Sequence, residues 1–360
     1  MNFAAGIKNR YETFSAMDAR DKGRAISELL VNNSLYILIL ATIIITCVVN
    51  PLFLSVGSIV NIFNLSAAKL PIACGIAGAI VLTGTDLSAG RVVGLTACMT
   101  AASLQASSYA KRMFGSLPLI PIPVVILIVI IVGAVVGWVN GFWVAKFKLH
   151  PFIVTLATQL IVYGALLLFV LINGQNGQPI SSLDQSVKDF VTGSFISVPG
   201  GARPVPIPNY VWIGFIVVVI TWFLWNKTTF GKNMFAVGSN QEAANVSGVN
   251  VNRTIILVHT LAGAMYGITG FIEAPRIGSG TSATGFNYEC DAIAACVIGG
   301  VSFVGGTGKV SGIVVGVFLL NIIFVALNAL SVNMNLQYII KGLIILVACA
   351  IDMRKYLVRK

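Results

Sequence analysis

The chain has 360 residues, of which 57% are hydrophobic and only 10% are charged, and its net charge is +11. Because a soluble domain carries about 25% charged residues, this composition excludes an ordinary soluble protein. Stretches 120–145 and 152–172 contain no charged residue, and each is long enough to cross a hydrocarbon core of roughly 30 Å. We therefore expect an all-α polytopic membrane protein rather than a β-barrel, which would show short alternating segments.

The basic residues gather at the ends of apolar segments, as the positive-inside rule expects, so they do not indicate a nucleic-acid partner. Lys8 and Arg10 lie near the N-terminus, and Arg359 and Lys360 lie at the C-terminus. Both termini are therefore expected on the cytoplasmic side, which requires an even number of spans. Lys111 and Arg112 fall on the outer side of the membrane in this scheme and are exceptions to the positive-inside rule.

Apolar runs follow one another along the whole chain and suggest about ten transmembrane helices. They lie near 35–50, 66–83, 88–107, 120–145, 152–172, 210–225, 254–274, 290–304, 310–330 and 337–351. The runs near 290–304 and 337–351 are short for a full span, so eight spans with re-entrant segments is the alternative. The polar loop 173–209 falls outside.

The stretch GTDLSAGR, residues 84–91, interrupts two apolar runs with charged, hydroxyl and glycine residues. A charge at the centre of a bilayer costs roughly 2.5–3.5 kcal/mol, so such a break marks a candidate translocation path. The path candidates are Gly84, Asp86, Ser88 and Gly90, with the glycines permitting sharp turns that could bring Asp86 close to Arg91. Alternatively, Asp86 and Ser88 are helix caps near the cytoplasmic interface, where Arg91 also belongs.

A similar break occurs later in the chain, because Val81–Leu95 aligns with Val297–Ile313 after a two-residue insertion. Repeated halves with interrupted helices are typical of transporters, whereas chance similarity in low-complexity membrane sequence is the alternative. The second copy contains GGTGK but fails the phosphate-loop pattern, since Phe303 and Val310 stand where Gly and Ser or Thr are required. We therefore expect no nucleotide-binding motif in this chain.

Other residue classes favour packing over chemistry. Glycines spaced by four, such as Gly133, Gly137 and Gly141, allow helices to approach closely in lipid. The six cysteines lie in apolar segments without metal-binding spacing, and the two histidines have no partner pattern, so no metal or catalytic residue is predicted. Lys69 and Lys341 lie within apolar runs and are expected to snorkel toward the interface.

Residues 226–253 form a polar loop that the charge pattern places in the cytoplasm. Within it, a short amphipathic helix capped by Ser239 or Asn240 and ended by Gly248 is predicted. Such a helix suits a partner that pushes on it, and an interfacial helix lying on the lipid surface is the alternative.

Glu242, Ala243, Ala244 and Gly248 resemble the EAA loop of ABC importer permeases, although the later part of that pattern is missing. Together with GTDLSAGR, YECDAIAACVIGGVSFVGGTGKVSG and QYIIKGLIILVACAID, this loop resembles the ribose-type sugar permease family. Thr85, Ala89 and Arg91 are similar to its galactose/methyl-galactoside branch in particular.

The resemblance implies a non-enzymatic permease in the bacterial inner membrane, built from two copies surrounded by lipid. A separate ATPase carrying ATP and Mg²⁺ would dock on the coupling residues, and a periplasmic binding protein would deliver the sugar, so this chain would need no cofactor. The implied organisation is a cytoplasmic arm (1–34), a transmembrane permease domain (35–353) containing the coupling loop (226–253), and a basic cytoplasmic tail (354–360).

Two other classes of transport protein remain as alternatives to the ATP-driven importer. One is a secondary sugar transporter with broken-helix repeats, and the other is a facilitative channel. A proton-coupled carrier would more often show an acid or a histidine deep within a span.

Overall fold

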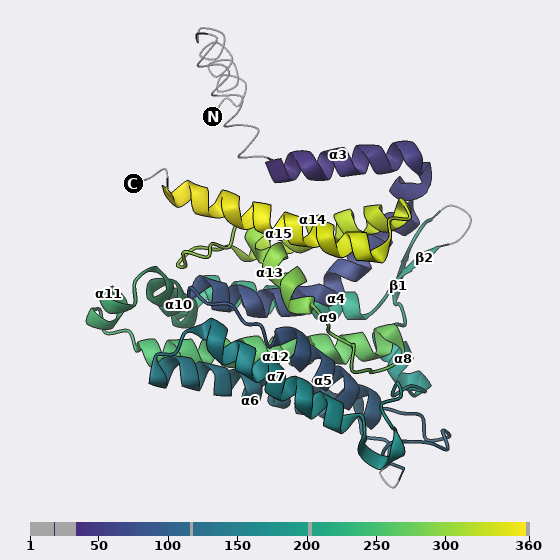
Figure 1. Ribbon diagram of the computed structural model, residues 1–360. Helices are drawn as coiled ribbons and strands as arrows, with labels where there is room; N and C mark the ends of the chain where they lie inside the picture. The colour runs from purple at the N-terminus through teal and green to yellow at the C-terminus, as the bar shows by residue number, and fades with distance from the viewer. Residues whose placement is uncertain (1–17, 19–33, 116–117, 201–203, 358–360) are drawn as a thin grey trace.

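The computed structural model describes residues 18, 34–115, 118–200 and 204–357, and this part of the chain is mainly helical with very little sheet (Figure 1). The expected N-terminal arm and the last three residues of the tail lie outside the described residues, apart from Asp18 and Ser34. The first elements are α3 (Ser34–Val49), η1 (Pro51–Leu54), α4 (Val56–Val81), α5 (Ala89–Ser103), α6 (Ile122–Phe147), α7 (Pro151–Phe169) and η2 (Ile172–Gly174). They are followed by α8 (Gln185–Val191), β1 (Ile196–Val198), β2 (Val205–Ile207), α9 (Tyr210–Lys227), α10 (Thr229–Ser239), α11 (Gln241–Val246), α12 (Val251–Ile277), α13 (Tyr288–Ile298), α14 (Val310–Ala329) and α15 (Met334–Leu357).

Six of the described helices, α4, α6, α7, α9, α12 and α14, are long and apolar enough to cross a membrane. Shorter apolar helical segments lie in α3 and α15. By contrast, α5 and α13 contain 15 and 11 residues, about 22 and 17 Å at 1.5 Å per residue, which is less than a bilayer core. The polytopic all-α fold is thus confirmed, and two of the ten apolar runs form short helices beside polar breaks.

The glycines spaced by four bring helix backbones into direct contact, as predicted. A Cβ atom on Gly133 would collide with the carbonyl of Gly263, and a Cβ on Gly263 would collide with the carbonyl of Gly133. Gly137 lies equally close to the backbone of His259, so α6 packs along much of α12. Because lipid supplies no hydrophobic force between helices, this close approach maximises van der Waals contact between the two spans.

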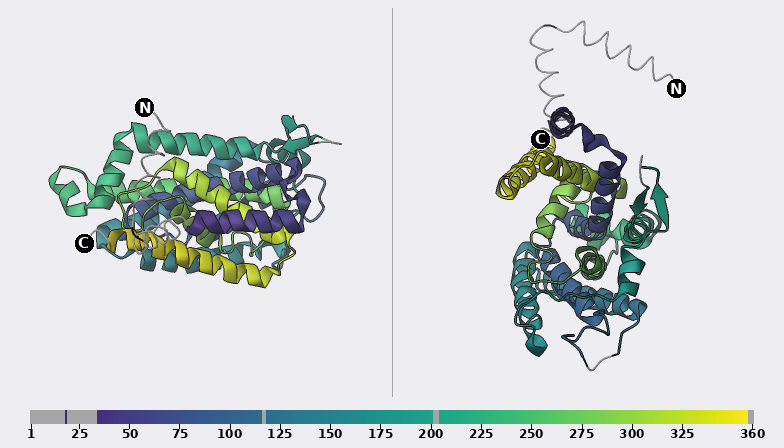
Figure 2. Two further views of the ribbon diagram at one scale, coloured as in Figure 1. Left: turned by 90° about the horizontal axis from the view of Figure 1, so that it is seen from above. Right: turned by 90° about the vertical axis from the view of Figure 1, so that its right-hand side faces the viewer.

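The two polar loops extend from opposite ends of the helix bundle (Figures 1 and 2). Helices α10 and α11 of the 226–253 loop project beyond the bundle at one end. The other end carries α8 and the antiparallel pair β1–β2, in which Ile196 faces Ile207. At the start of α8, the Asp184 carboxylate accepts hydrogen bonds from the Ser186 hydroxyl and amide, which lower the pKa of Asp184.

Candidate functional site

The first polar break lies between Val81, the last residue of α4, and Ala89, the first residue of α5. The chain turns at Thr83, whose φ of 63° is left-handed. The hydroxyl of Thr155 in α7 then donates to the carbonyl of Thr85 and accepts from the amide of Leu87, both at 3.2 Å. The exposed backbone of the break is therefore satisfied by a neighbouring span, as backbone at membrane depth requires.

Asp86 is fully buried and is the centre of a hydrogen-bond network that crosses four elements. One carboxylate oxygen accepts from the amide of Ser88 at 2.9 Å and from its hydroxyl at 2.6 Å. The other oxygen accepts from the hydroxyl of Tyr266 in α12 at 3.1 Å. The Ser88 hydroxyl accepts from Asn140 in α6 at 3.0 Å, and Asn140 accepts from Thr158 in α7 at 2.6 Å.

This network bears on the hypothesis that Asp86 and Ser88 are helix caps. Ser88 occupies the N-cap position of α5 but makes no side-chain capping bond, whereas the Asp86 carboxylate accepts from the Ser88 amide at the start of the helix. The predicted approach of Asp86 to Arg91 is wrong, because Arg91 instead lies against the rings of Tyr163 and Phe286. The network holds the break in one position against α6, α7 and α12.

Gly84 and Gly90 are required for close packing rather than for unusual backbone angles. Neither belongs to the glycines with positive φ. A Cβ on Gly84 would lie 2.9 Å from the ring of Pro151, and a Cβ on Gly90 would collide with the carbonyl of Gly285 and the carboxylate of Glu289. These two glycines thus contact the start of α7 and the region where α13 begins, in place of the expected sharp turns. All four path candidates are buried in this structure, and Gly84 also borders a cavity.

The second break, between Gly299 and Lys309, touches the first. The amide of Gly306 donates to the carbonyl of Val81 at 2.9 Å. A long helix precedes the first break and a short one follows it, whereas the short helix α13 precedes the second break and the long helix α14 follows it. The two aligned stretches therefore have the same parts in opposite order, and their polar segments meet.

The predicted cytoplasmic helix is α11, and Asn240 is its cap. The Asn240 side chain accepts from the amide of Ala243 at 2.9 Å, and Gly248 ends the helix with a φ of 83°. Glu242 and Ala243 are exposed, whereas Ala244 is buried against the rest of the loop. The preceding helix α10 was not foreseen; its last turn brings Gly238 and Ser239 into contact with Gly305 and Gly306. The loop is thus connected directly to the second break.

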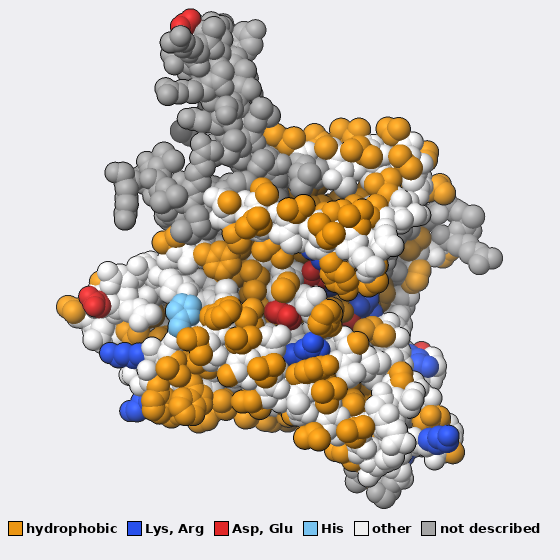
Figure 3. Space-filling view, in the orientation of Figure 1, with side chains coloured by type: hydrophobic (Ala, Val, Ile, Leu, Met, Phe, Trp, Pro, Cys, Tyr) orange, Lys and Arg blue, Asp and Glu red, His pale blue; other side chains and the backbone are white. Residues whose placement is uncertain are grey.

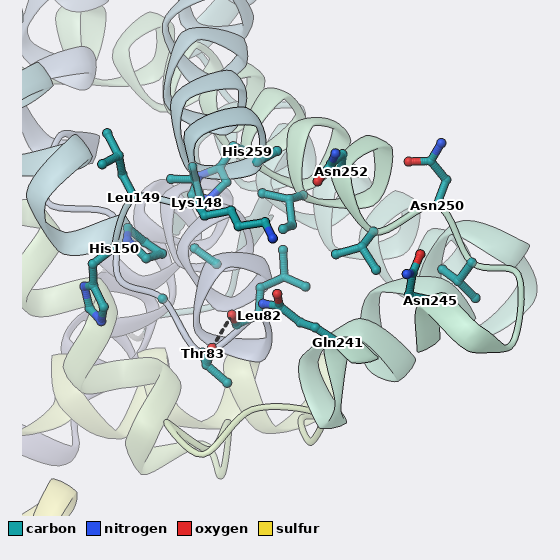
Figure 4. A pocket seen from close by; sticks show the side chains of 18 of the residues that line it. Leu82, Thr83, Lys148, Leu149, His150, Gln241, Asn245, Asn250, Asn252 and His259 are labelled. Atoms are coloured by element: carbon teal, nitrogen blue, oxygen red, sulfur yellow. Dashed lines mark hydrogen bonds between the residues drawn. The ribbon is translucent and has the colours of Figure 1, made fainter. Parts of the chain in front are cut away.

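An open cavity of about 900 Å³ separates α11 from the transmembrane helices (Figure 4). Its lining includes Thr83 and Gly84 from the first break, Lys148 from the α6–α7 loop, and Asn245 from α11. His259 lies at its inner end, 1% exposed, with a buried Nδ1 atom that has no hydrogen-bond partner among the described residues.

A cluster of ion pairs surrounds the start of α13. Asp291 pairs with Lys69 of α4 at 2.7 Å and with Lys341 of α15 at 3.0 Å. Both lysines, for which the sequence suggested snorkelling, are thus held by one buried carboxylate. Nearby, Glu273 pairs with Arg276 at 2.6 Å and accepts from the hydroxyl of Tyr288 at 3.1 Å.

Sequence reasoning missed the Asp291 pairs because Lys69, Asp291 and Lys341 come from helices far apart in the chain. The available signal was the presence of oppositely charged residues within apolar runs, which in membranes usually pair or face a polar path. Within the described residues, no group of three or more His, Cys, Asp or Glu side chains could hold a metal ion.

A bundle of apolar spans, two meeting helix breaks and an exposed loop helix define a multi-pass membrane permease. The family model described as "Branched-chain amino acid transport system / permease component" matches residues 33–349, and the chain belongs to this family. It is 44% identical to the galactose/methyl galactoside import permease protein MglC of Haemophilus influenzae, over 96% of this chain and all of that protein.

Two further relatives show the same pattern. The chain is 46% identical to the galactose/methyl galactoside import permease protein MglC of Escherichia coli, over 91% of this chain and 95% of that protein. It is 32% identical to the ribose import permease protein RbsC of Haemophilus influenzae, over 91% of this chain and 94% of that protein. No solved structure matches the chain.

Proposed function

We propose that this chain is the membrane-spanning permease subunit of an ATP-driven importer for galactose and methyl galactoside. The substrate assignment is supported by the relatives named as galactose/methyl galactoside import permeases. The working complex contains two copies of the chain, a separate ATPase that binds ATP and Mg²⁺, and a periplasmic binding protein that delivers the sugar. It lies in the bacterial inner membrane, with both termini of the chain in the cytoplasm.

The observation that carries the ATP-driven mechanism is the placement of α11. This helix lies beyond the end of the bundle with Gln241, Glu242 and Ala243 exposed. Val246, at the end of α11, is 89% exposed. An apolar side chain gains no stability from such exposure to water. Such a helix offers a polar and an apolar contact to an ATPase, with Glu242, Ala243, Ala244 and Gly248 forming the coupling segment.

The contacts behind α11 provide a physical route from the ATPase to the broken helices. The end of α10, which adjoins α11, packs on Gly305 and Gly306, and Gly306 is hydrogen-bonded to the end of α4. A displacement of the loop therefore reaches both breaks through backbone contacts. Asp86, Ser88, Gly84 and Gly90 stay candidates for the translocation path, acting through the position of the first break.

Reconstitution in proteoliposomes with the partner ATPase and the binding protein tests this function. Galactose uptake is expected to require ATP inside the compartment that contains the ATPase, and an ATPase variant that cannot hydrolyse ATP should abolish uptake. Uptake that ignores ATP but collapses with a protonophore would instead establish a secondary transporter. Uptake that needs neither and only follows the sugar gradient would establish a channel.

A further inference from the structure

Arg91 lies in the first turn of α5 with most of its hydrogen-bonding capacity unused. Among the described residues, its guanidinium donates a single hydrogen bond, to the carbonyl of Ser282 at 3.4 Å. A guanidinium carries five N–H donors. No salt bridge includes Arg91 in the described part of the chain, where the ion pairs join Lys69, Arg276 and Lys341 to carboxylates.

Two aromatic rings flank this cation. The guanidinium carbon of Arg91 lies 4.1 Å from the centroid of the Tyr163 ring in α7 and 5.1 Å from that of Phe286, just before α13. Phe286 is 51% exposed. These rings stabilise the cation and fix the plane of the guanidinium, while leaving apolar ring surface accessible beside it.

Glu289 adds a carboxylate to the same place. It belongs to the first turn of α13, is 6% exposed, and lies directly against the backbone of Gly90, the residue before Arg91. The neighbouring Cys290 is exposed. We call Arg91, Tyr163, Phe286, Glu289 and Cys290 the α13 face.

Helix α13 lies near the middle of the bundle's length and not at either loop-bearing end (Figure 1). Acidic and basic side chains gather in the middle of the surface in Figure 3, with apolar bands above and below them. Charged groups that face hydrocarbon are costly, so intramembrane charges face a bundle interior or a water-filled path. A face that places a half-buried cation and a buried carboxylate beside the exposed Phe286 and Cys290 therefore indicates water or a polar ligand.

We propose that the α13 face is a sugar-contacting wall of the translocation path, with Arg91 and Glu289 binding hydroxyl groups and Tyr163 and Phe286 contacting the apolar side of the sugar ring. This inference rests on the proposed function, because it names where the transported sugar touches the chain. The guanidinium donates to neighbouring hydroxyls and the carboxylate accepts from them. Since one cation and one anion lie together, the site suits a neutral, hydroxyl-rich ligand better than an anionic one.

Thiol labelling tests whether the face is wet. In a variant with Cys47→Ser and Cys349→Ser, Cys290 is the exposed native cysteine, because Cys74, Cys98 and Cys296 are buried. Maleimides react with thiolates, which form in water and not in lipid. The matched control adds Cys290→Ala and Ile216→Cys, the latter at a position of α9 that is 55% exposed on a membrane span. In proteoliposomes, N-ethylmaleimide should label Cys290 at least about tenfold faster than the thiol introduced on α9 in the control.

Sugar protection and transport test whether the wet face handles the sugar. With the ATPase and binding protein present, galactose should slow the labelling of Cys290 during turnover, and sorbitol should not. Arg91→Ala and Glu289→Gln should lower the maximal uptake rate at least about tenfold, with an unchanged galactose concentration for half-maximal uptake, because the binding protein captures the sugar first. Arg91→Lys keeps the charge but loses the planar donors, so its maximal uptake rate should lie between those of these two variants and the parent.

The outcomes separate this inference from the proposed function. Equal, slow labelling of both thiols would show that the face meets lipid and would overturn the inference. Normal uptake in the Arg91 and Glu289 variants would also overturn the inference. The same holds for reduced uptake that is explained wholly by reduced co-purification of the ATPase. If the parent complex transports no galactose in the presence of ATP, the proposed function fails, while the labelling still reports whether the face is wet.

Discussion

The backbone amide of Gly306 donates a 2.9 Å hydrogen bond to the carbonyl of Val81, and this bond joins the two helix breaks of the permease. Val81 ends a long helix, and no amide within that helix can donate to its carbonyl. Gly306 belongs to a loop that also contacts Ser239 at the end of α10. One residue thus connects the loop that we propose for ATPase coupling to the helix that precedes GTDLSAGR.

Gly306→Ala is expected to break this connection. Gly306 has a φ of 67°, and a Cβ there would collide with Ser239. Gly300→Ala is the matched control, because Gly300 has a φ of 84° but no atom within 4 Å of the added Cβ. Both variants carry the left-handed backbone cost of about 1–2 kcal/mol. Thermal unfolding in detergent and ATP-driven uptake should show a larger loss for Gly306→Ala, and equal losses would contradict the steric argument.

Asp86→Ala is expected to destabilise the protein, because it removes an acceptor from three donors on Ser88 and Tyr266. Each buried group left without a partner costs about 1–3 kcal/mol. Asp86→Asn keeps one acceptor oxygen and should be milder, and Tyr266→Phe removes only one donor. Unfolding midpoints and the yield of membrane-inserted protein should follow this order. If Asp86→Ala inserted and unfolded like the parent, the network would not stabilise the break.

Val246→Asp is expected to abolish ATPase binding without loss of stability, because this side chain is 89% exposed and projects from the end of α11. Glu242→Lys, at an exposed position of the same helix, should weaken binding by reversing its charge. Ala244→Asp is the contrasting variant, since Ala244 is buried and an acid there should destabilise the loop itself. Co-purification of the ATPase and the unfolding midpoint distinguish these effects. An ATPase that still co-purifies with Val246→Asp would place its docking surface elsewhere.

Asp291→Asn should destabilise the bundle more than Lys341→Met does. The first change leaves two ammonium groups without a carboxylate, whereas the second leaves Asp291 paired with Lys69 at 2.7 Å. Because both lysines are about one-fifth exposed and are partly solvated, the difference is expected to be about 1–2 kcal/mol rather than the larger cost of a fully buried charge. The unfolding midpoints of Asp291→Asn and Lys341→Met measure this difference. Lys69→Met, Lys341→Met and their double variant test the sharing of the carboxylate, since only the double variant leaves Asp291 unpaired. Additive losses in this cycle would contradict sharing of the carboxylate.

The amino-acid sequence by itself determined the class, most of the helices and the loop motif. Composition alone excludes a soluble fold, because long uncharged segments such as 120–145 have no stable place in water. The position of α11 followed from Asn240 and Gly248, since capping and helix termination are local interactions of neighbouring residues. The four-residue spacing of Gly133 and Gly137 likewise specified a contact face on one helix.

Only the tertiary structure decided which partner each polar residue takes. The sequence allowed Asp86 to approach Arg91, five residues away, but it bonds to Tyr266, 180 residues further along the chain. Lys69 likewise pairs with Asp291, 222 residues away. In a membrane interior a charge takes the nearest available partner, because none is offered by lipid. That partner is set by how α4, α12, α13 and α15 pack together, and helix packing depends on contacts that no local stretch of sequence contains.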